Sequence, residues 1–464
     1  MADSVVVILA AGQGTRMRSS VSKLLHPLCG QPIIRWPVAA AREAGIGRVV
    51  VVDSPERRLH DALDQDVVTV IQERPLGTGD AVRAATAEFA EAGTVLVLNG
   101  DAPLIEPDTL RGMLDAHERS GAAATIATMT LEDPSGYGRV VRDPNGTVEK
   151  VVETKAHGDA TELERHIREV NTGMFAFQGP ALARALTEVR ADNAQGEYYL
   201  PDVIPVLRSH ERTVAAYEIV DQEQLAQIND RRQLAEVTAL AQARIHVRHQ
   251  LAGVTIVSPA ATIIDAGVTI GADTVVAPFT SLHGTTAIGS GARVGPHSTL
   301  LDAVIQDGAK VLHAYIDSAT VGPRASVGPF AYLRPGTILR EGAKAGTFVE
   351  IKNSDVGAGS KVPHLSYIGD ADIGEGTNLG ASTITANYDG YRKHRTTIGN
   401  RVKTSVDTTL VAPVAVGDDA YTGAGSVITK DVPGGALGIA RAHQRNLDGY
   451  AEKRRGREEN GPSS

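Results

Sequence analysis

A six-residue repeat dominates the second half of the chain. Apolar or small residues recur at every sixth position in three runs, which extend from Ile270 to Leu300, from Val321 to Ile351 and from Ile398 to Ile428. Six residues make one side of a triangular coil, with the repeated side chain inward and a small residue at the corner. One coil cannot bury its apolar face alone, so stacked coils must supply the core. The spacing therefore predicts a solenoid over residues 253–450.

The first half of the chain has a different sequence pattern. Residues 1–222 alternate continuous apolar runs, such as "SVVVILAA" and "TVLVLNGD", with helical patterns. Strands without polar alternation are buried on both faces, which predicts a parallel sheet covered by helices on each side. Residues 223–252 predict a linker helix, because Leu234, Val237, Ala241 and Ile245 share one helical face. The hexapeptide period breaks between Thr385 and Ile398, where "NYDGYRKHR" should loop out, and we expect a disordered tail over 451–464.

Charge and cysteine content exclude several classes of protein. The formal net charge is −9 and no strongly basic block precedes the tail, so we expect no nucleic-acid partner. No apolar stretch approaches the ~20 residues of a membrane span. The only cysteine, Cys29, cannot form an intrachain disulfide and fits a small, semi-buried structural residue better than a reactive thiol. These features predict a cytoplasmic protein.

The stretch "LAAGQGTRMRSSVSK", residues 9–23, is the first candidate site. Glycines after a strand let backbone N–H groups approach an anion, and Arg16 and Lys23 add positive charge. The stretch is neither a Walker loop nor a dinucleotide fingerprint, because no Gly-Lys-Ser/Thr follows and Met17 replaces the third glycine. The residues alone leave a plain glycine turn with surface basic side chains as an equal alternative.

Family motifs favour the phosphate site. "LAAGQGTRM" followed by Lys23 resembles the leader of the sugar-1-phosphate nucleotidylyltransferases, "IQERPLGTGDAV" is similar to their base-reading segment, and "VLVLNGDAPLI" places Asp101 at a strand end. With the hexapeptide domain attached, residues from about 4 to 450 resemble bifunctional enzymes that acetylate glucosamine-1-phosphate and uridylylate N-acetylglucosamine-1-phosphate. The resemblance implies an α/β fold: a Rossmann-like nucleotidyltransferase domain followed by a left-handed parallel β-helix of hexapeptide repeats.

The resemblance implies a UTP site, with Mg²⁺ as cofactor, in the first domain. Arg16 and Lys23 would be its catalytic cations, and Asp101 and Asn229 its metal ligands. The sugar phosphate is itself the nucleophile, so catalysis needs positioning and charge stabilisation rather than a strong base. The implied nucleotide-binding residues are Leu9, Ala10, Ala11, Gly12, Gly14, Lys23, Gln72, Gly77 and Thr78. The implied sugar-phosphate residues are Gly138, Glu153, Asn171 and Asn229.

A second site is implied on the coil, where acetyl-CoA is the co-substrate. His364 would be the general base, because an amine must lose a proton to attack a thioester and imidazole titrates near neutrality. The implied acetyl-acceptor residues are Arg334, Lys352, His364, Tyr367, Asn378 and Lys393. The implied acetyl-CoA residues are Ala381, Asn387, Tyr388, Val406, Ala424 and Arg441. The family packs three coils side by side, so we expect a homotrimer with sites between chains.

One departure bears on the acetyl-transfer site. The family pattern "GSDT" reads Ser405-Val406-Asp407-Thr408, so the usual serine hydroxyl is absent. Acetyl transfer is expected to persist but at a reduced rate.

Two alternative functions stay open. One is a uridylyltransferase whose β-helix serves only assembly or regulation. The other is a non-catalytic assembly subunit, although such subunits tend to lose the Arg16, Lys23 and Asp101 set.

Overall fold

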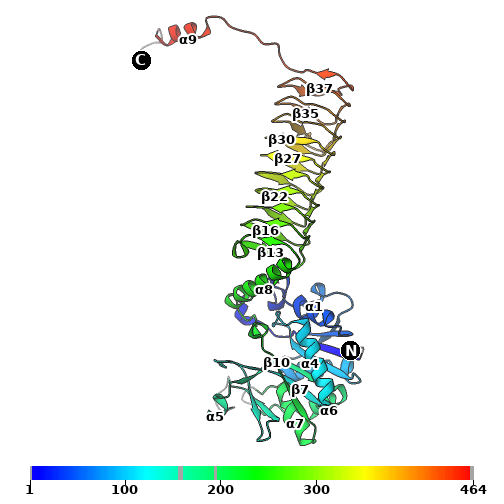
Figure 1. The fold of residues 1–464 in the computed structure, drawn as a ribbon, viewed down its shortest axis with the longest axis vertical. Coiled ribbons are helices and arrows are strands. Elements are labelled where there is room, and N and C mark those ends of the chain that lie inside the picture. Colours follow the sequence, from blue (N-terminus) through cyan, green and yellow to red (C-terminus); the bar gives the residue numbers. More distant parts are fainter. Residues whose placement is uncertain (1–2, 155–159, 193–195, 460–464) are drawn as a thin grey trace. The chain divides into compact units, whose positions relative to one another are not determined.

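A mixed β-sheet forms the centre of the first half of the protein. The computed structural model describes residues 3–154, 160–192 and 196–459, and the chain divides into two units, residues 1–245 and 246–464. In the first unit the main strand order is β11-β7-β10-β6-β1-β4-β5, and the β8–β9 hairpin pairs with β10 (Figure 1). The strands are β1 (Ser4–Leu9), β4 (Arg48–Asp53), β5 (Val68–Ile71), β6 (Thr94–Asn99), β7 (Ala124–Thr130), β8 (Arg139–Arg142), β9 (Val148–Val152), β10 (Glu169–Phe177) and β11 (Val214–Glu218).

The sheet is not fully parallel, which corrects the expectation from the sequence. β10 runs antiparallel to both β6 and β7. The β8–β9 hairpin and the short helix α5 (Glu162–Arg165) intervene between β7 and β10 in place of a single crossover helix. A parallel neighbour needs a crossover connection, whereas hairpin-type excursions can return the chain in the opposite direction. A strand buried on both faces is apolar whether it runs parallel or antiparallel to its neighbours. The hydrophobic pattern therefore could not reveal the direction of β10.

Helices cover the sheet and complete its core. They are α1 (Arg35–Glu43), α2 (Thr78–Ala84), α3 (Thr86–Phe89), α4 (Pro107–Ser120), α6 (Gly179–Glu188) and α7 (Val203–Ser209). Val7, Val97 and Phe177 from the central strands are fully buried together with Phe89 and Leu182 from the helices. Cys29 is buried as well, and its Sγ accepts a hydrogen bond from Gln242 Nε2 at 3.1 Å, in keeping with the structural role predicted for it.

The second unit is a parallel β-helix. Its strands stack into three parallel sheets, one along each side of the coil, which begin with β12 (Thr255–Ile256), β13 (Thr262–Ile264) and β14 (Thr269–Ile270) (Figure 1). Thr262 pairs with Thr280 and Ser281 with Thr299, so three six-residue sides make one turn. The side chains at the six-residue spacing are buried throughout the three predicted runs. The predicted solenoid is confirmed.

The break in the repeat is an excursion from the coil, as predicted. β33 (Ile384–Ala386) ends the regular path and β34 (Thr396–Ile398) resumes it. Tyr388 and Tyr391 between them are exposed, and Tyr388 pairs with Lys393 in a short antiparallel bridge.

Two helices flank the coil in sequence. Helix α8 (Arg231–Leu251) lies where the linker helix was predicted, with Val237, Ala241 and Ile245 buried, and the division between the two units falls within it. Helix α9 (Tyr450–Glu459) occupies most of the tail that was predicted to be disordered, because its Glu, Lys and Arg residues have high helix propensity. Residues 460–464 lie outside the described part. Among the described helices, none has the length and apolar composition that crossing a bilayer requires.

Candidate active sites

The loop after β1 brings Lys23 back against the glycine turn. Gly14 has a φ of +60°, and a Cβ at this position would lie 2.7 Å from the Cβ of Lys23. Only glycine permits both the left-handed backbone and this close approach. Lys23 begins a short 3₁₀ helix, Lys23–Leu25, whose next residue, Leu24, is buried. The glycine turn therefore holds Lys23 at the carboxyl end of the sheet.

Four of the predicted site residues meet at this point. The Nζ of Lys23 lies 2.6 Å from Oδ2 of Asp101 and 3.3 Å from Oδ1 of Asn229. The same amide oxygen accepts a hydrogen bond of 2.9 Å from Arg16 Nη2. Lys23 and Asp101 are largely shielded, with side-chain exposures of 11% and 20%, so salt screens this ion pair less than a surface pair. Two cations and two oxygen ligands from distant parts of the chain thus form one cluster.

Backbone contacts hold the two oxygen ligands together. The N–H of Ile228 donates to the carbonyl of Asp101 at 3.0 Å, and Gln233 accepts from the backbone N–H of Asn229 at 2.9 Å. The sequence analysis missed Gln233, although "QINDRRQL" contains a helix-capping pattern that could have indicated it. Asp230 lies just before α8, and its carboxylate accepts a hydrogen bond from the N–H of Gln233 in the first turn. These bonds fix Asn229 beside Asp101.

The base-reading segment is folded against a distant turn. Gly77 has a φ of +104°, the N–H of Gly79 donates to the carbonyl of Tyr198 at 2.7 Å, and the Thr78 hydroxyl accepts from the N–H of Leu200 at 3.0 Å. Gln72 follows β5 directly and is buried. Leu9, Ala10 and Ala11 line the end of β1, where the N–H of Ala10 donates to Val52 in the neighbouring strand β4.

The predicted sugar residues lie on the β8–β9 hairpin and on β10. The N–H of Asn171 donates to the carbonyl of Gly138 at 2.9 Å, and a Cβ on Gly138 would lie 3.2 Å from Oε1 of Glu153. Asp202, missed in the sequence, faces the same carboxylate. Burial and the charge of Glu153 raise the pKa of Asp202 to about 6.

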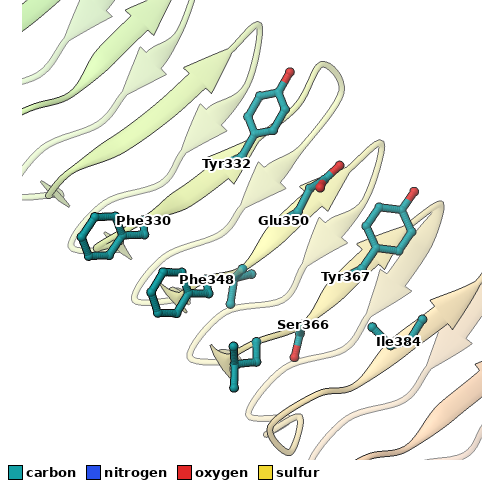
Figure 2. Close-up of a pocket in the computed structure, with 9 residues that line it drawn as sticks. Phe330, Tyr332, Phe348, Glu350, Ser366, Tyr367 and Ile384 are labelled. Atoms are coloured by element: carbon teal, nitrogen blue, oxygen red, sulfur yellow. The ribbon is translucent and has the colours of Figure 1, made fainter.

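A groove of about 410 Å³ on the coil contains part of the second predicted site. Tyr332, Glu350 and Tyr367 lie side by side on successive coils, on strands β25 (Ala331–Leu333), β28 (Glu350–Lys352) and β31 (Tyr367–Gly369). Figure 2 shows these three side chains on one side of the coil, with Phe330 and Phe348 along an adjoining edge. Glu350 was missed in the sequence. Its carboxylate pairs with Arg334 at 2.9 Å.

Two lysines of the predicted acceptor site meet near this groove. A hydrogen bond to Lys393 lowers the pKa of Lys352, with desolvation and the charge of Lys393 acting in the same direction. The nearby carboxylate of Asp370 accepts hydrogen bonds from the side chains of Asn353 and Asn387. Two adjacent ammonium groups repel each other, and an anionic ligand would relieve that repulsion.

The side chains of Tyr367 and Asn387 both approach Gly369 closely. A Cβ on Gly369 would lie 2.5 Å from the hydroxyl of Tyr367 and 2.7 Å from Nδ2 of Asn387, so a larger residue here would displace both groups. His364 ends β30 (Lys361–His364), and its carbonyl accepts from the Ser366 hydroxyl at 2.7 Å and from the N–H of Ser382 at 3.1 Å. Its imidazole is exposed, as is Asn378 one coil further along.

Three of the six predicted acetyl-CoA residues form a line across three coils. The N–H of Asp407 donates to the carbonyl of Ala381, and the N–H of Gly425 to that of Val406. Ala381, Val406 and Ala424 are therefore stacked, and Val406 is 47% exposed. Tyr388 lies in the inserted loop. Arg441 is exposed after the last coil, and none of the hydrogen bonds described joins it to the other predicted residues.

The fold and the two clusters define a class of protein: an NTP-transferase domain joined to a parallel β-helix. The family model of the MobA-like NTP transferase domain matches residues 6–195. Proteins named bifunctional protein GlmU are similar to the whole chain. The protein from Streptomyces avermitilis is 49% identical over 97% of this chain and 95% of its own length. The proteins from Mycobacterium marinum and Mycolicibacterium vanbaalenii are 46% and 48% identical, each over 98% of this chain and 94% of their own length.

The chain belongs to the bifunctional GlmU family. This membership confirms the family resemblance, the fold class and the bifunctional transferase function predicted from the sequence.

Proposed function

We propose that this chain catalyses two steps of UDP-N-acetylglucosamine synthesis. The β-helix unit transfers the acetyl group of acetyl-CoA to glucosamine-1-phosphate. The α/β unit then joins N-acetylglucosamine-1-phosphate to the uridylyl group of UTP and releases pyrophosphate. The single observation that carries this proposal is the cluster of Arg16, Lys23, Asp101 and Asn229 at the end of β1. The co-substrates and the single cysteine favour a cytoplasmic enzyme.

In uridylyl transfer the chain supplies positioning and charge. Gly12 is exposed, and a Cβ there would meet no atom within 4 Å, so packing within the chain does not require this glycine. A phosphate that approaches the backbone N–H groups of this turn would explain why position 12 is glycine. Arg16 and Lys23 face the same space and stabilise negative charge on the triphosphate, while Gly138, Glu153 and Asn171 hold the sugar phosphate for in-line attack.

Magnesium fits the oxygen ligands of this cluster. Asp101 offers a carboxylate and Asn229 an amide oxygen, and both already contact a cationic group. Among the described residues no group of three acidic, histidine or cysteine side chains forms a complete cage, and Mg²⁺ typically keeps waters and binds phosphate oxygens in such sites. Bound at Asp101 and Asn229, Mg²⁺ would neutralise charge on the phosphates of UTP.

In acetyl transfer the amine of glucosamine-1-phosphate attacks the thioester carbonyl while His364 accepts a proton from the amine, and the C–S bond breaks to release coenzyme A, whose thiolate takes up a proton. Lys352, Lys393 and Arg334 bind the phosphate, and Tyr367 and Asn378 orient the sugar. The residues that contact acetyl-CoA are Ala381, Asn387, Tyr388, Val406, Ala424 and Arg441.

The assembly that we propose is a homotrimer formed through the β-helix. A ladder of rings runs along one edge of the coil, with centroid distances of 4.2–5.2 Å between neighbours, through Phe279, His297, His313, Phe330 and Phe348. Phe279, Phe330 and Phe348 are all more than half exposed, so a neighbouring coil that covers them would bury substantial apolar area. Light scattering should give three times the chain mass, and a monomeric mass would contradict the proposal.

Two assays test the two activities separately. Purified protein with UTP, Mg²⁺ and N-acetylglucosamine-1-phosphate should release pyrophosphate, and acetyl-CoA with glucosamine-1-phosphate should release free thiol. If pyrophosphate alone is released, the second candidate function holds, in which the β-helix serves only assembly or regulation. The exposed Val406 in the acetyl-CoA line is the observation that favours this alternative.

The double change Val406→Ser with Ser405→Gly should raise the acetyl-transfer rate up to about 10-fold, because a hydroxyl would restore one hydrogen bond in the line. Thiol release at saturating acetyl-CoA measures this. Val406→Ala is the control that removes bulk without adding a hydroxyl. Equal rates for the double variant and the unmodified enzyme would reject the idea.

A further inference from the structure

The side-chain amide of Gln72 is held by two acceptors. Its Nε2 donates to the carbonyl oxygen of Gly77 at 3.1 Å and to Oδ2 of Asp80 at 2.9 Å. The backbone N–H of Gln72 donates to Asp53 at 2.9 Å, which anchors the residue at the end of β5. Both hydrogens of the amide nitrogen are therefore used within the protein.

These two bonds determine which way the amide faces. A carbonyl oxygen and a carboxylate can only accept hydrogen bonds. If the Gln72 amide rotated by 180°, its own oxygen would face both acceptors, and two attractive contacts would become repulsive. The oxygen Oε1 must therefore face away from Gly77 and Asp80. None of the hydrogen bonds recorded among the described residues reaches it.

Asp80 lies in the first turn of α2. Its other oxygen, Oδ1, faces Arg83 at 3.9 Å. The guanidinium of Arg83 stacks on the ring of Tyr198 at 4.5 Å and donates to the carbonyl of Leu186 at 2.9 Å. These contacts hold the charge of Arg83 beside Asp80, which favours the ionised carboxylate that accepts from Gln72.

We propose that Asp80 is a positioning residue that determines base specificity: it orients Gln72 so that the nucleotide site presents a hydrogen-bond acceptor to the base. Uracil and thymine carry a ring N3–H donor at their Watson–Crick edge. Cytosine carries an unprotonated N3 acceptor there, which would face the oxygen of Gln72. The site therefore selects UTP and dTTP over CTP. This inference rests on the proposed uridylyl transfer.

Steady-state kinetics of the full chain with UTP, dTTP and CTP test the inference, with N-acetylglucosamine-1-phosphate as acceptor. In the unmodified enzyme kcat/KM should rank UTP and dTTP above CTP. Asp80→Ala removes one of the two acceptors that orient the amide, so the ratio of kcat/KM for UTP to that for CTP should fall up to roughly 10-fold, mainly through KM. Asp80→Asn keeps the shape of the side chain but can donate to Oε1, and should lower the ratio as well.

The matched control is Glu73→Gln, which removes an exposed carboxylate next to Gln72. It should leave the ratio unchanged, whereas a purely structural effect of Asp80→Ala would lower the rates with UTP and CTP equally. An unchanged UTP-to-CTP ratio in both Asp80 variants would overturn the inference while leaving the proposed function intact. An unmodified enzyme that uses CTP as well as UTP would also overturn it. Absence of transfer from all three nucleotides would refute the proposed function, and this inference with it.

Discussion

Replacing His364 with alanine should lower the turnover number of acetyl transfer by about 10²–10⁴-fold, the range that general-base catalysis contributes. The hydroxyl of Ser366 and the N–H of Ser382 bind the backbone carbonyl of His364, so the position of the residue does not depend on its ring. The loss should therefore be chemical rather than structural. Thiol release from acetyl-CoA measures it, and uridylyl transfer by the same preparation should be unchanged.

A matched control exists on an earlier coil. His283 also ends a strand, β16 (Thr280–His283), and its imidazole contacts Asp265 at 3.3 Å. His283→Ala should leave acetyl transfer intact. Added imidazole should restore part of the rate of His364→Ala, because a small base can enter the space left by the ring. Full activity of His364→Ala without imidazole would show that another group removes the proton.

Replacing Lys23 with alanine should lower uridylyl transfer by at least ~10-fold and up to about 10³-fold, the range for removing one group that stabilises transition-state charge. The ammonium of Lys23 contacts both Asp101 and Asn229. Its loss removes positive charge from the triphosphate and also leaves the carboxylate of Asp101 without its partner. Pyrophosphate release at varied UTP measures the effect on kcat and on KM separately.

Arg18→Ala is the control for Lys23→Ala, because Arg18 is a cation of the same loop and its side chain is exposed. It should change kcat little, while acetyl transfer should survive in both variants. An unchanged kcat and an unchanged KM for UTP in Lys23→Ala would contradict the role of Lys23.

The β-helix could be predicted almost completely because its structure is local. Each coil repeats the same short pattern, so the spacing of Val321, Val327 and Leu333 specifies burial without knowledge of distant segments. The glycine turn before Lys23 was recognisable for a similar reason, since it follows an apolar strand directly. The direction of β10 was not, because an apolar strand looks the same in either orientation.

The contacts that form the two candidate sites join residues far apart in the chain. Motifs in the amino-acid sequence were enough to predict a nucleotide site with Lys23 and Asp101, and a β-helix that carries His364 as the general base. Only the tertiary structure decides that Asn229 reaches Lys23, that Glu350 pairs with Arg334 and that the amide of Gln72 donates to Asp80. Periodicity and propensity describe neighbours along the chain, whereas these contacts depend on chain direction and on which strand ends meet at one edge.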